Sequence, residues 1–243
     1  MIYFISDLHL GVLDRKEDKK REDLFLDLMD NIKPSCDKLY LVGDMFDYWF
    51  DYRTVIPKYF YRTLAKFKEF TDSGIEIEYL MGNHDFGHYK FFEEELGITV
   101  IQHDIERVHN GKRFFISHGD GKADKDSGYL ILRAILRNKL ANYIYRIIHP
   151  DWGIGLASGS SKKSRSYTDS KDYGENEGMV KFAKKKIDEG FDYVIMGHRH
   201  RKLELKYGNG IYYNLGEWIK EPSYGVFDGE EFRLERVEIA LKK

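Results

Sequence analysis

Short apolar runs recur along the chain, and stretches with helical spacing separate the first of them. Two amphipathic helices are expected over Glu22–Asn31 and Tyr59–Phe70. Because the apolar runs are continuous and stop at turn-forming residues, they are predicted to be buried strands. Strands that alternate with helices predict an α/β fold with a layered sheet. The five predicted strands are Ile2–Ser6, Leu39–Val42, Ile75–Met81, Phe114–Ser117 and Tyr193–Met196.

The last forty residues show a different pattern. Short runs with strand character follow one another closely, and the turn signals Gly208-Asn209-Gly210 and Asp228-Gly229 separate two pairs of them. Turns of this kind favour hairpins, so antiparallel strands are expected here. They are predicted over Leu203–Tyr207, Ile211–Asn214, Gly225–Phe227 and Phe232–Ile239.

The stretch between the fourth and fifth predicted strands interrupts the alternation. Tyr129–Ile148 is largely apolar at helical spacing, although arginines and a lysine interrupt it, and Ala157–Asp172 is small, polar and basic. A charged helix is predicted over Glu177–Glu189. We interpret residues 121–176 as a helical cap inserted into a core formed by residues 1–120 and 177–243. An ordinary helical layer of that core is the alternative.

Composition and charge narrow the range of functions. The chain has 243 residues with 39 basic and 41 acidic side chains, a formal charge of −2 that argues against a general nucleic-acid binder. A single cysteine, Cys36, excludes an intrachain disulfide framework and a cysteine-only metal site, and fits the reducing cytoplasm. The chain begins with a predicted strand, and no uncharged apolar run approaches the ~18 residues of a membrane span. Any membrane contact is therefore expected to be peripheral.

Polar clusters follow directly after the five predicted strands. Each cluster alone is a weak signal, since a Gly-Asp pair is often only a turn and an isolated histidine is often structural. Loops at the carboxyl ends of parallel strands meet in one crevice, so five such clusters are expected to converge. The clusters are Asp7-Leu8-His9, Gly43-Asp44-Met45-Phe46-Asp47, Gly82-Asn83-His84-Asp85, His118-Gly119-Asp120 and Gly197-His198-Arg199-His200.

These clusters predict a site for two metal ions. Oxygen and imidazole donors without thiolate favour Mn²⁺, with Fe or Zn as alternatives. Seven candidate ligands exceed one tetrahedral site and fit two ions that share a carboxylate, which we assign to Asp44. Two ions about 3.5–4 Å apart suit the displacement of a phosphoryl group. The candidate ligands are Asp7, His9, Asp44, Asn83, His118, His198 and His200.

The order of these motifs resembles the calcineurin-like metallophosphoesterase superfamily, whose elements are all matched between Asp7 and His200. The resemblance implies a four-layer α/β/β/α sandwich with a dinuclear site, in which hydroxide generated at the metals attacks phosphorus. It implies that His84, paired with Asp85, is the catalytic non-ligand histidine. It also divides the ligands into two sets that share Asp44: Asp7, His9, Asp44 and His200 for one ion, and Asp44, Asn83, His118 and His198 for the other.

A narrower resemblance is to the UDP-2,3-diacylglucosamine diphosphatase branch, which acts in lipid A synthesis. It is carried by His118-Gly119-Asp120-Gly121, Asp126-Ser127-Gly128-Tyr129 and the apolar insertion that follows. It implies cleavage of a UDP-linked diacyl sugar to UMP and a diacylglucosamine 1-phosphate, with the cap as an acyl-chain pocket. It further implies a cytoplasmic enzyme in peripheral contact with the inner face of the membrane.

Substrate contacts are expected from a second group of residues. By the same resemblance Asp126 contacts substrate. From their charge alone, Lys162, Lys163 and Arg165 are candidates to pair with phosphate, and a solvated loop is the simpler explanation for this basic stretch. Asn83 and His198 complete the predicted substrate-binding set. Members of the branch carry Arg where this chain has His84. Two other functions stay open: a general phosphodiesterase or phosphatase of nucleotides or small phosphoesters, and a metal-free scaffold.

Overall fold

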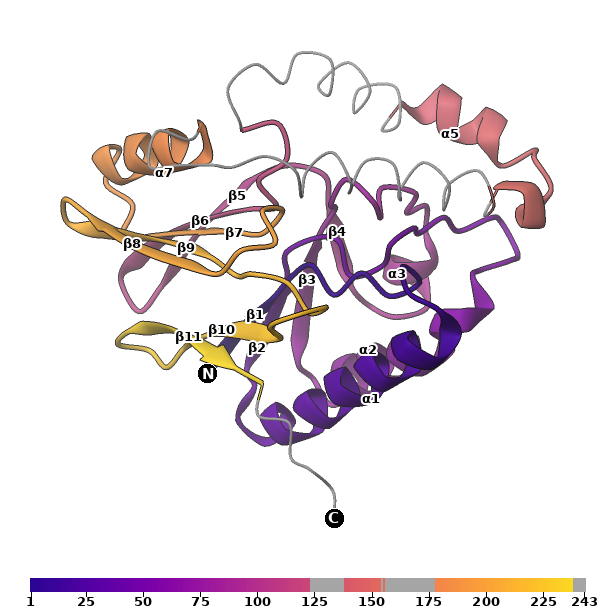
Figure 1. Cartoon of the computed structure of the whole chain (residues 1–243), viewed down its shortest axis with the longest axis horizontal. Coiled ribbons are helices and arrows are strands. Elements are labelled where there is room, and N and C mark those ends of the chain that lie inside the picture. The colour runs from indigo at the N-terminus through magenta and orange to yellow at the C-terminus, as the bar shows by residue number, and fades with distance from the viewer. Residues whose placement is uncertain (123–137, 154, 156–177, 238–243) are drawn as a thin grey trace.

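Two β-sheets lie face to face at the centre of the protein (Figure 1). The computed structural model describes residues 1–122, 138–153, 155 and 178–237. The first sheet has six strands in the order β11-β10-β1-β2-β3-β4, with bounds Phe232–Arg236, Ser223–Phe227, Ile2–Ile5, Lys38–Leu41, Glu76–Leu80 and Thr99–Ile101. The second has five strands in the order β5-β6-β7-β9-β8, with bounds Ile105–His109, Lys112–Ser117, Tyr193–Met196, Gly210–Asn214 and Leu203–Tyr207.

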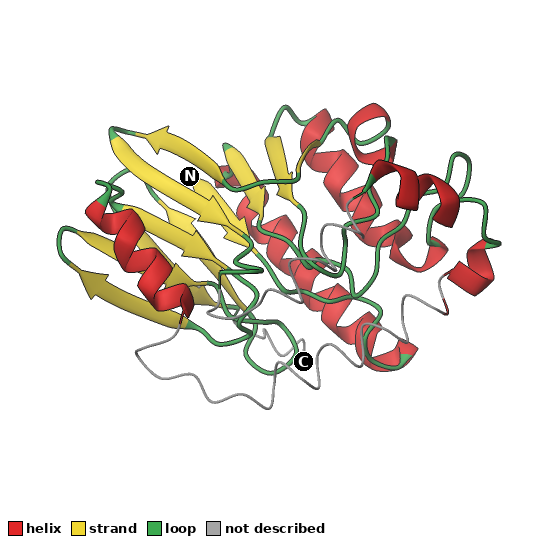
Figure 2. Cartoon of the chain, turned by 90° about the horizontal axis from the view of Figure 1, so that it is seen from above, coloured by secondary structure: helices red, strands yellow, loops and turns green. Residues whose placement is uncertain are grey.

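Alternation along the buried strands divides the core into three layers of side chains. Tyr3 and Ile5 of β1 face the helices α1 (Arg15–Ile32) and α2 (Tyr61–Asp72), whereas Phe4 faces the second sheet. On the far side, the second sheet packs against α7 (Gly178–Asp188). The central strands of both sheets are therefore apolar on both faces, which explains why they are continuous hydrophobic runs. The result is the expected four-layer α/β/β/α sandwich, with helices outside the paired sheets (Figure 2).

The helix α1 begins seven residues earlier than the pattern predicts. Its N-cap is Asp14, whose side chain accepts hydrogen bonds from the backbone N–H groups of Lys16 and Glu17. The first two turns contribute charged residues to the buried face, so a search for an apolar stripe misses them. The buried positions keep helical spacing throughout: Asp18, Arg21, Glu22, Phe25, Leu28, Met29 and Ile32.

The remaining elements confirm the predicted strands and add others. The C-terminal pairs are antiparallel as expected, but β8 and β9 join the second sheet while β10 and β11 join the first. The sequence did not indicate β4, β5 or the short helix α3 (Phe91–Glu94), because β4 has three residues and β5 is mostly polar. Two 3-10 turns, Lys33–Ser35 and Lys58–Phe60, adjoin α1 and α2.

The insertion between β6 and β7 is described only in part. The helix α5 (Lys139–Tyr145) lies within the apolar stretch predicted to be helical, and Asn138 caps its first N–H groups. Asp126, Lys163 and Arg165 lie outside the described residues, as do residues 129–137 and 157–172 of the two predicted segments. In the described ranges no helix combines the length and apolar character that crossing a membrane requires.

Candidate metal centre

The five motif loops converge where the two sheets meet. They follow β1, β2 and β3 of the first sheet and β6 and β7 of the second, so the site joins both halves of the sandwich. Backbone hydrogen bonds tie neighbouring loops together. The Asp7 N–H donates to the Gly43 carbonyl at 3.1 Å, and the Gly197 N–H donates to the His118 carbonyl at 3.0 Å. Parallel pairing aligns the loops within each sheet, and the packing of the two sheets brings together residues as far apart in sequence as His9 and His200.

Five motif residues adopt a backbone conformation that side chains other than glycine rarely take. Among the described residues with positive φ, only Asn110 is a non-glycine residue outside the motifs. Such conformations cost of order 1–3 kcal/mol each and cluster where function requires them. The loops therefore hold these side chains in place at the expense of backbone stability. The five are Asp7, His9, Asp44, His198 and His200, with φ of 51°, 48°, 54°, 69° and 53°.

Two motif glycines are required by close approach to the carboxylates. A Cβ on Gly82 would lie 2.0 Å from Asp44 Oδ1, and one on Gly197 would lie 2.4 Å from Asp7 Oδ2. Both distances are far inside van der Waals contact, so any larger residue would displace a carboxylate. The glycines thus set the depth to which Asp7 and Asp44 are buried.

The first group of candidate ligands is Asp7, His9, Asp44 and His200, whose donor atoms lie within 4.8 Å of one another. His9 Nε2 lies 3.0 Å from His200 Nε2, 3.6 Å from Asp7 Oδ1 and 3.8 Å from Asp44 Oδ2. Two imidazole nitrogens and two carboxylate oxygens pointing at one another form a donor set suited to Mn, Fe or Zn.

The second group is Asp44, His118 and His198, with Asn83 beside it. His118 Nε2 lies 3.3 Å from Asp44 Oδ2 and 3.1 Å from Asn83 Oδ1. The same Asp44 oxygen also faces His9 of the first group. This buried oxygen thus faces one imidazole nitrogen from each group, which fits an atom shared between two cation sites. The residues therefore fit two divalent ions, as the sequence predicts.

The pKa values of Asp7, His9 and His198 favour the charge states that metal binding requires, whereas His118 must lose a proton before it can bind a cation. Burial alone would raise the pKa of Asp7, but hydrogen bonds with His200 and His9 outweigh it and hold that pKa well below its usual range. Burial lowers the pKa of His9 to about 3 and that of His198 to about 4. His118 differs: the Asp44 carboxylate overcomes burial and raises its pKa to about 10. Ionised carboxylates and neutral imidazoles are the metal-binding forms.

The structure corrects the expected pairing of His84 with Asp85. The carboxylate beside the His84 imidazole is that of Asp47, with Nδ1 and Oδ1 3.7 Å apart, and Nδ1 also faces the Asp47 carbonyl at 3.3 Å. His84 Nε2 lies on the side of the cluster, 4.0 Å from Asp44 Oδ2. Asp47 therefore orients the ring, so that Nε2 lies toward the cluster.

Asp85 instead joins two ligand loops. Its carboxylate accepts hydrogen bonds from the Met45 and Gly82 N–H groups at 2.8 Å each and from the Tyr79 hydroxyl. Burial, followed by the charge of Asp44, raises the pKa of Asp85 to about 6. Sequence reasoning missed Tyr79, which looks like one more apolar strand residue. The only signal is that a fully buried tyrosine needs a partner for its hydroxyl.

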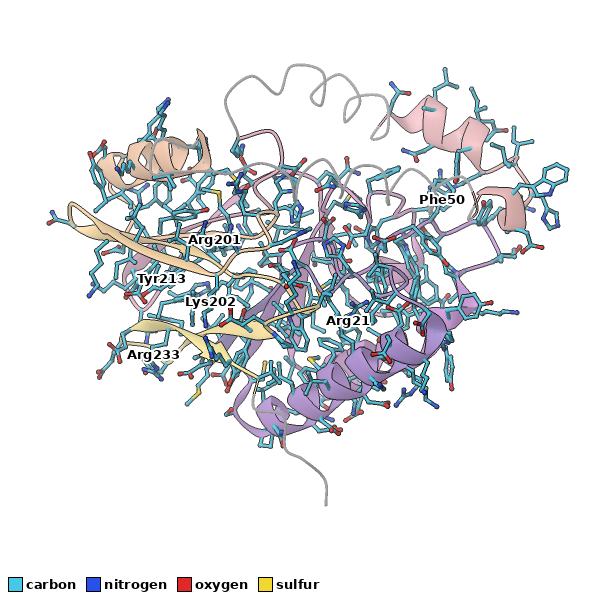
Figure 3. All side chains as sticks on the ribbon, viewed as in Figure 1. Arg21, Phe50, Arg201, Lys202, Tyr213 and Arg233 are labelled. Carbon is cyan, nitrogen blue, oxygen red and sulfur yellow. The ribbon has the colours of Figure 1, made fainter. Side chains whose placement is uncertain are left out.

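A second missed contact lies behind His9. Arg21 of α1, labelled in Figure 3, is buried and donates to the His9 carbonyl at 2.7 Å and to Asp18 Oδ1 at 2.5 Å. Asp18 accepts in turn from the Gly11 N–H at 2.9 Å. The pair thus fixes the loop that follows β1. The sequence signal was present: two opposite charges three residues apart on the buried face of a helix.

Comparison with known proteins agrees with this geometry. A model of the calcineurin-like phosphoesterase family matches residues 1–202. The chain therefore belongs to that family and is a metal-dependent phosphoesterase with a dinuclear site.

Individual relatives are more specific. The protein is 36% identical to a UDP-2,3-diacylglucosamine hydrolase of Porphyromonas gingivalis over 98% of this chain and 97% of the relative. It is 30% identical to one of Pseudomonas fluorescens, over 96% and 94%. Among solved structures, an archaeal phosphodiesterase aligns over 97% of this chain and 98% of its own, with 16% identity and a TM-score of 0.45.

Proposed function

We propose that this protein hydrolyses the pyrophosphate of UDP-2,3-diacylglucosamine to UMP and 2,3-diacylglucosamine 1-phosphate. One observation carries the proposal. The similarity to the hydrolase of Porphyromonas gingivalis covers 98% of this chain, so it includes the insertion and not only the metal loops. A general phosphoesterase would need only the loops.

The chain's own residues divide the reaction between them. Two divalent ions, when bound, supply positive charge to the phosphoryl oxygens and lower the pKa of water. Asp44 neutralises charge between the two groups, because its Oδ2 faces His9 and His118. His84, held by Asp47, presents Nε2 to a phosphoryl oxygen or to the leaving oxygen. Asn83 is placed at the edge of the cluster, where its amide would donate to a phosphoryl oxygen.

The finer parts of the proposal concern the metal, the cap and the membrane. Mn²⁺ is our choice of ion, with Fe and Zn as alternatives, because oxygen and imidazole donors accept all three. We assign residues 1–120 and 177–243 to the core, and 121–176 to a cap that receives the acyl chains. We also place the enzyme in peripheral contact with the inner face of the cytoplasmic membrane.

The described part of the insertion supports contact with lipid. Leu140, Tyr143, Ile144 and Ile147 are 67%, 65%, 55% and 73% exposed, as is Trp152 at 73%. Exposed apolar side chains gathered on one short segment mark interaction surfaces more often than chance. Tryptophan and tyrosine also favour the membrane interface.

The test is release of UMP from UDP-2,3-diacylglucosamine with Mn²⁺ in detergent. Bis-p-nitrophenyl phosphate and UDP-sugars without acyl chains are the comparison substrates, and the His9→Ala variant controls for contaminating activity. Preferred turnover of the acylated substrate supports the proposal. Turnover of the simple diester alone would leave a general phosphoesterase, and absence of both activities from protein without stoichiometric metal would indicate a scaffold.

A separate experiment addresses the membrane. We expect the wild type to co-sediment with vesicles of anionic phospholipid and the Ile144→Ser/Ile147→Ser variant to remain in the supernatant. Equal sedimentation of the two proteins would reject this segment as the contact surface.

Metal analysis of purified protein, followed by reconstitution of the metal-free protein with Mn²⁺, Fe²⁺ or Zn²⁺, tests the choice of ion.

A further inference from the structure

The loops that follow two of the metal motifs form one joined platform. They comprise residues 46–52, after β2, and residues 86–91, after β3. The Gly87 N–H donates to the Trp49 carbonyl at 3.1 Å, and the Asp51 N–H donates to the Gly87 carbonyl at 3.2 Å. We call these two loops the platform. Each loop is continuous with a loop that carries metal ligands. A segment that packs on the platform therefore has a defined position relative to the metal centre.

The platform is tightly packed. The Asp51 carboxylate, 1% exposed, accepts from the N–H groups of Lys90 and Phe91 at 3.0 Å each. A Cβ on Gly87 would lie 2.3 Å from the Trp49 carbonyl oxygen, so the two loops approach more closely than any other residue would permit. The platform is therefore a firm support, since moving either loop would break several hydrogen bonds between them.

Arg146, the residue at the C-terminal end of α5, lies against both loops. Its guanidinium carbon is 5.0 Å from the ring centroid of Phe50 and 4.3 Å from that of Tyr89, one ring from each loop. Its Nε donates to the Asp51 carbonyl at 3.2 Å. The Tyr145 ring packs on Phe50 with centroids 4.5 Å apart. Phe50, labelled in Figure 3, lies on the core side of α5.

The other end of the segment also touches the platform. The Tyr145 hydroxyl donates to the Gly153 carbonyl, which joins the last turn of α5 to the end of the segment 138–153. A Cβ on Gly153 would lie 2.4 Å from the Tyr52 hydroxyl. The segment 138–153 thus contacts the platform at Tyr145 and Arg146 and approaches it closely at Gly153, while Leu140, Tyr143 and Ile144 stay exposed.

We propose that Arg146 is a positioning residue for substrate selection: it anchors the segment 138–153 on the platform and so holds the exposed apolar side chains of α5 in register with the metal centre. The proposal rests on the proposed function, in which the acyl chains are the part of the substrate that contacts this segment. A small phosphodiester needs the metal loops alone, and its hydrolysis is independent of the anchor.

Arginine suits this position better than lysine. A planar guanidinium stacks between two rings while its Nε keeps a directed hydrogen bond to a carbonyl, whereas an ammonium is a strongly hydrated point charge. The Arg146→Lys variant therefore preserves charge and approximate length but loses the anchor. Arg113 offers a matched control. It stacks on Phe191 at 4.3 Å and donates to the carbonyls of Glu189 and Gly190, at the opposite end of β6 from the metal loop.

The experiment compares Arg146→Lys with Arg113→Lys on two substrates. For Arg146→Lys we expect KM for UDP-2,3-diacylglucosamine to rise about tenfold with kcat within twofold. Hydrolysis of bis-p-nitrophenyl phosphate and the metal content are expected to stay within twofold of wild type. Arg113→Lys is expected to leave both substrates within twofold. Hydrogen exchange of residues 139–148 is followed in all three proteins, and we expect at least tenfold faster exchange in Arg146→Lys alone.

Each outcome decides the proposal. An unchanged KM for the acylated substrate overturns it, as does an equal loss on both substrates, which would place the effect in the metal loops. If the wild type does not cleave the acylated substrate, the proposed function fails. In that case the exchange data still decide the anchor: faster exchange in Arg146→Lys supports it, and unchanged exchange removes it.

Discussion

The metal centre and the segment 138–153 both break the rule that charged side chains lie at the surface and apolar ones in the core, but they break it in opposite ways. Around the metal centre, charged side chains such as Asp7, Asp44 and Asp85 are fully buried. On α5, Leu140 and Ile144 are more than half exposed. A buried carboxylate is costly unless it is paired, and an exposed apolar patch is costly in water. Each region thus departs from the rule in the direction that its ligand requires: buried carboxylates suit cations at the metal centre, and exposed apolar side chains suit the lipid contact that we propose for α5.

The largest expected effect tests the buried side of this comparison. Asp44→Asn keeps the shape of the side chain but removes the charge shared by both metal groups. We expect hydrolysis of bis-p-nitrophenyl phosphate to fall by about 10³-fold or more, and bound metal to fall from two ions to one or none. Metal analysis and initial rates measure both. Asp192→Asn, at the end of β7 opposite the metal loop, is the control. A variant of Asp44 that keeps two ions would contradict the shared role.

A smaller effect is expected from the hydroxyl that supports Asp85. Tyr79→Phe removes one donor to this carboxylate and should weaken Mn²⁺ binding by about 10–100-fold, with a loss of about 1–2 kcal/mol in the free energy of unfolding. Calorimetric titration of metal-free protein and urea unfolding give the two values. Tyr213→Phe removes a similar buried hydroxyl, which donates to the Phe232 carbonyl away from the metals. If both variants bind Mn²⁺ equally well, Tyr79 is only structural.

A third prediction concerns a buried histidine outside the metal centre. Burial among Trp49, Tyr79 and Phe92 lowers the pKa of His88 to about 3. Below pH 6.5 the unfolded chain binds a proton at this residue that the folded chain does not, so stability falls as the pH drops from about 6.5 toward 3. At pH 5 this contribution reaches about 2 kcal/mol.

The His88→Phe variant fits the aromatic surroundings and removes this term. Urea unfolding at pH 7.5 and pH 5 should therefore show a smaller loss of stability in the variant than in the wild type. The exposed His103, replaced by Gln, is the control and should behave like the wild type. Equal losses in the wild type and in His88→Phe would show that His88 does not contribute.

The smallest effect belongs to the exposed side of the comparison. Ile147→Ser changes a side chain that is 73% exposed, so the free energy of unfolding should stay within about 0.5 kcal/mol of wild type. The same replacement at the buried Ile195 of β7 should cost several kcal/mol, since it leaves a cavity and a hydroxyl in the core between the sheets. A large loss of unfolding free energy in Ile147→Ser would mean that this side chain packs against the protein and is not exposed to solvent.

The sequence predicted the strands of the double sheet well because they are apolar on both faces. Its failures have local causes. β5 alternates buried with polar exposed positions over only five residues, and α1 begins with charges on its buried face. Neither resembles the apolar pattern that defines an element in sequence.

The metal centre was predicted at the level of residues and not of contacts. Motif spacing brought Asp7, His9, Asp44, His118, His198 and His200 together, because each motif ends a strand. Spacing does not say which carboxylate faces which imidazole. Asp85 is adjacent to His84 in sequence, but the turn at Gly82 directs its side chain toward Tyr79 and the Met45 N–H, and Asp47 takes the expected place. Contacts of this kind depend on the tertiary structure.

The left-handed backbone of five ligand-bearing residues has a consequence for protein engineering. A procedure that ranks substitutions by backbone compatibility would favour glycine or asparagine at Asp7, His9, Asp44, His198 and His200, and would gain thermal stability with each exchange. Glycine would delete a metal-binding atom at each position, and asparagine would replace a charged carboxylate or an imidazole with a weaker neutral amide oxygen. The most heat-resistant version of this chain would consequently be an inert one, and screens for robust variants need a metal-loading assay alongside the melting temperature.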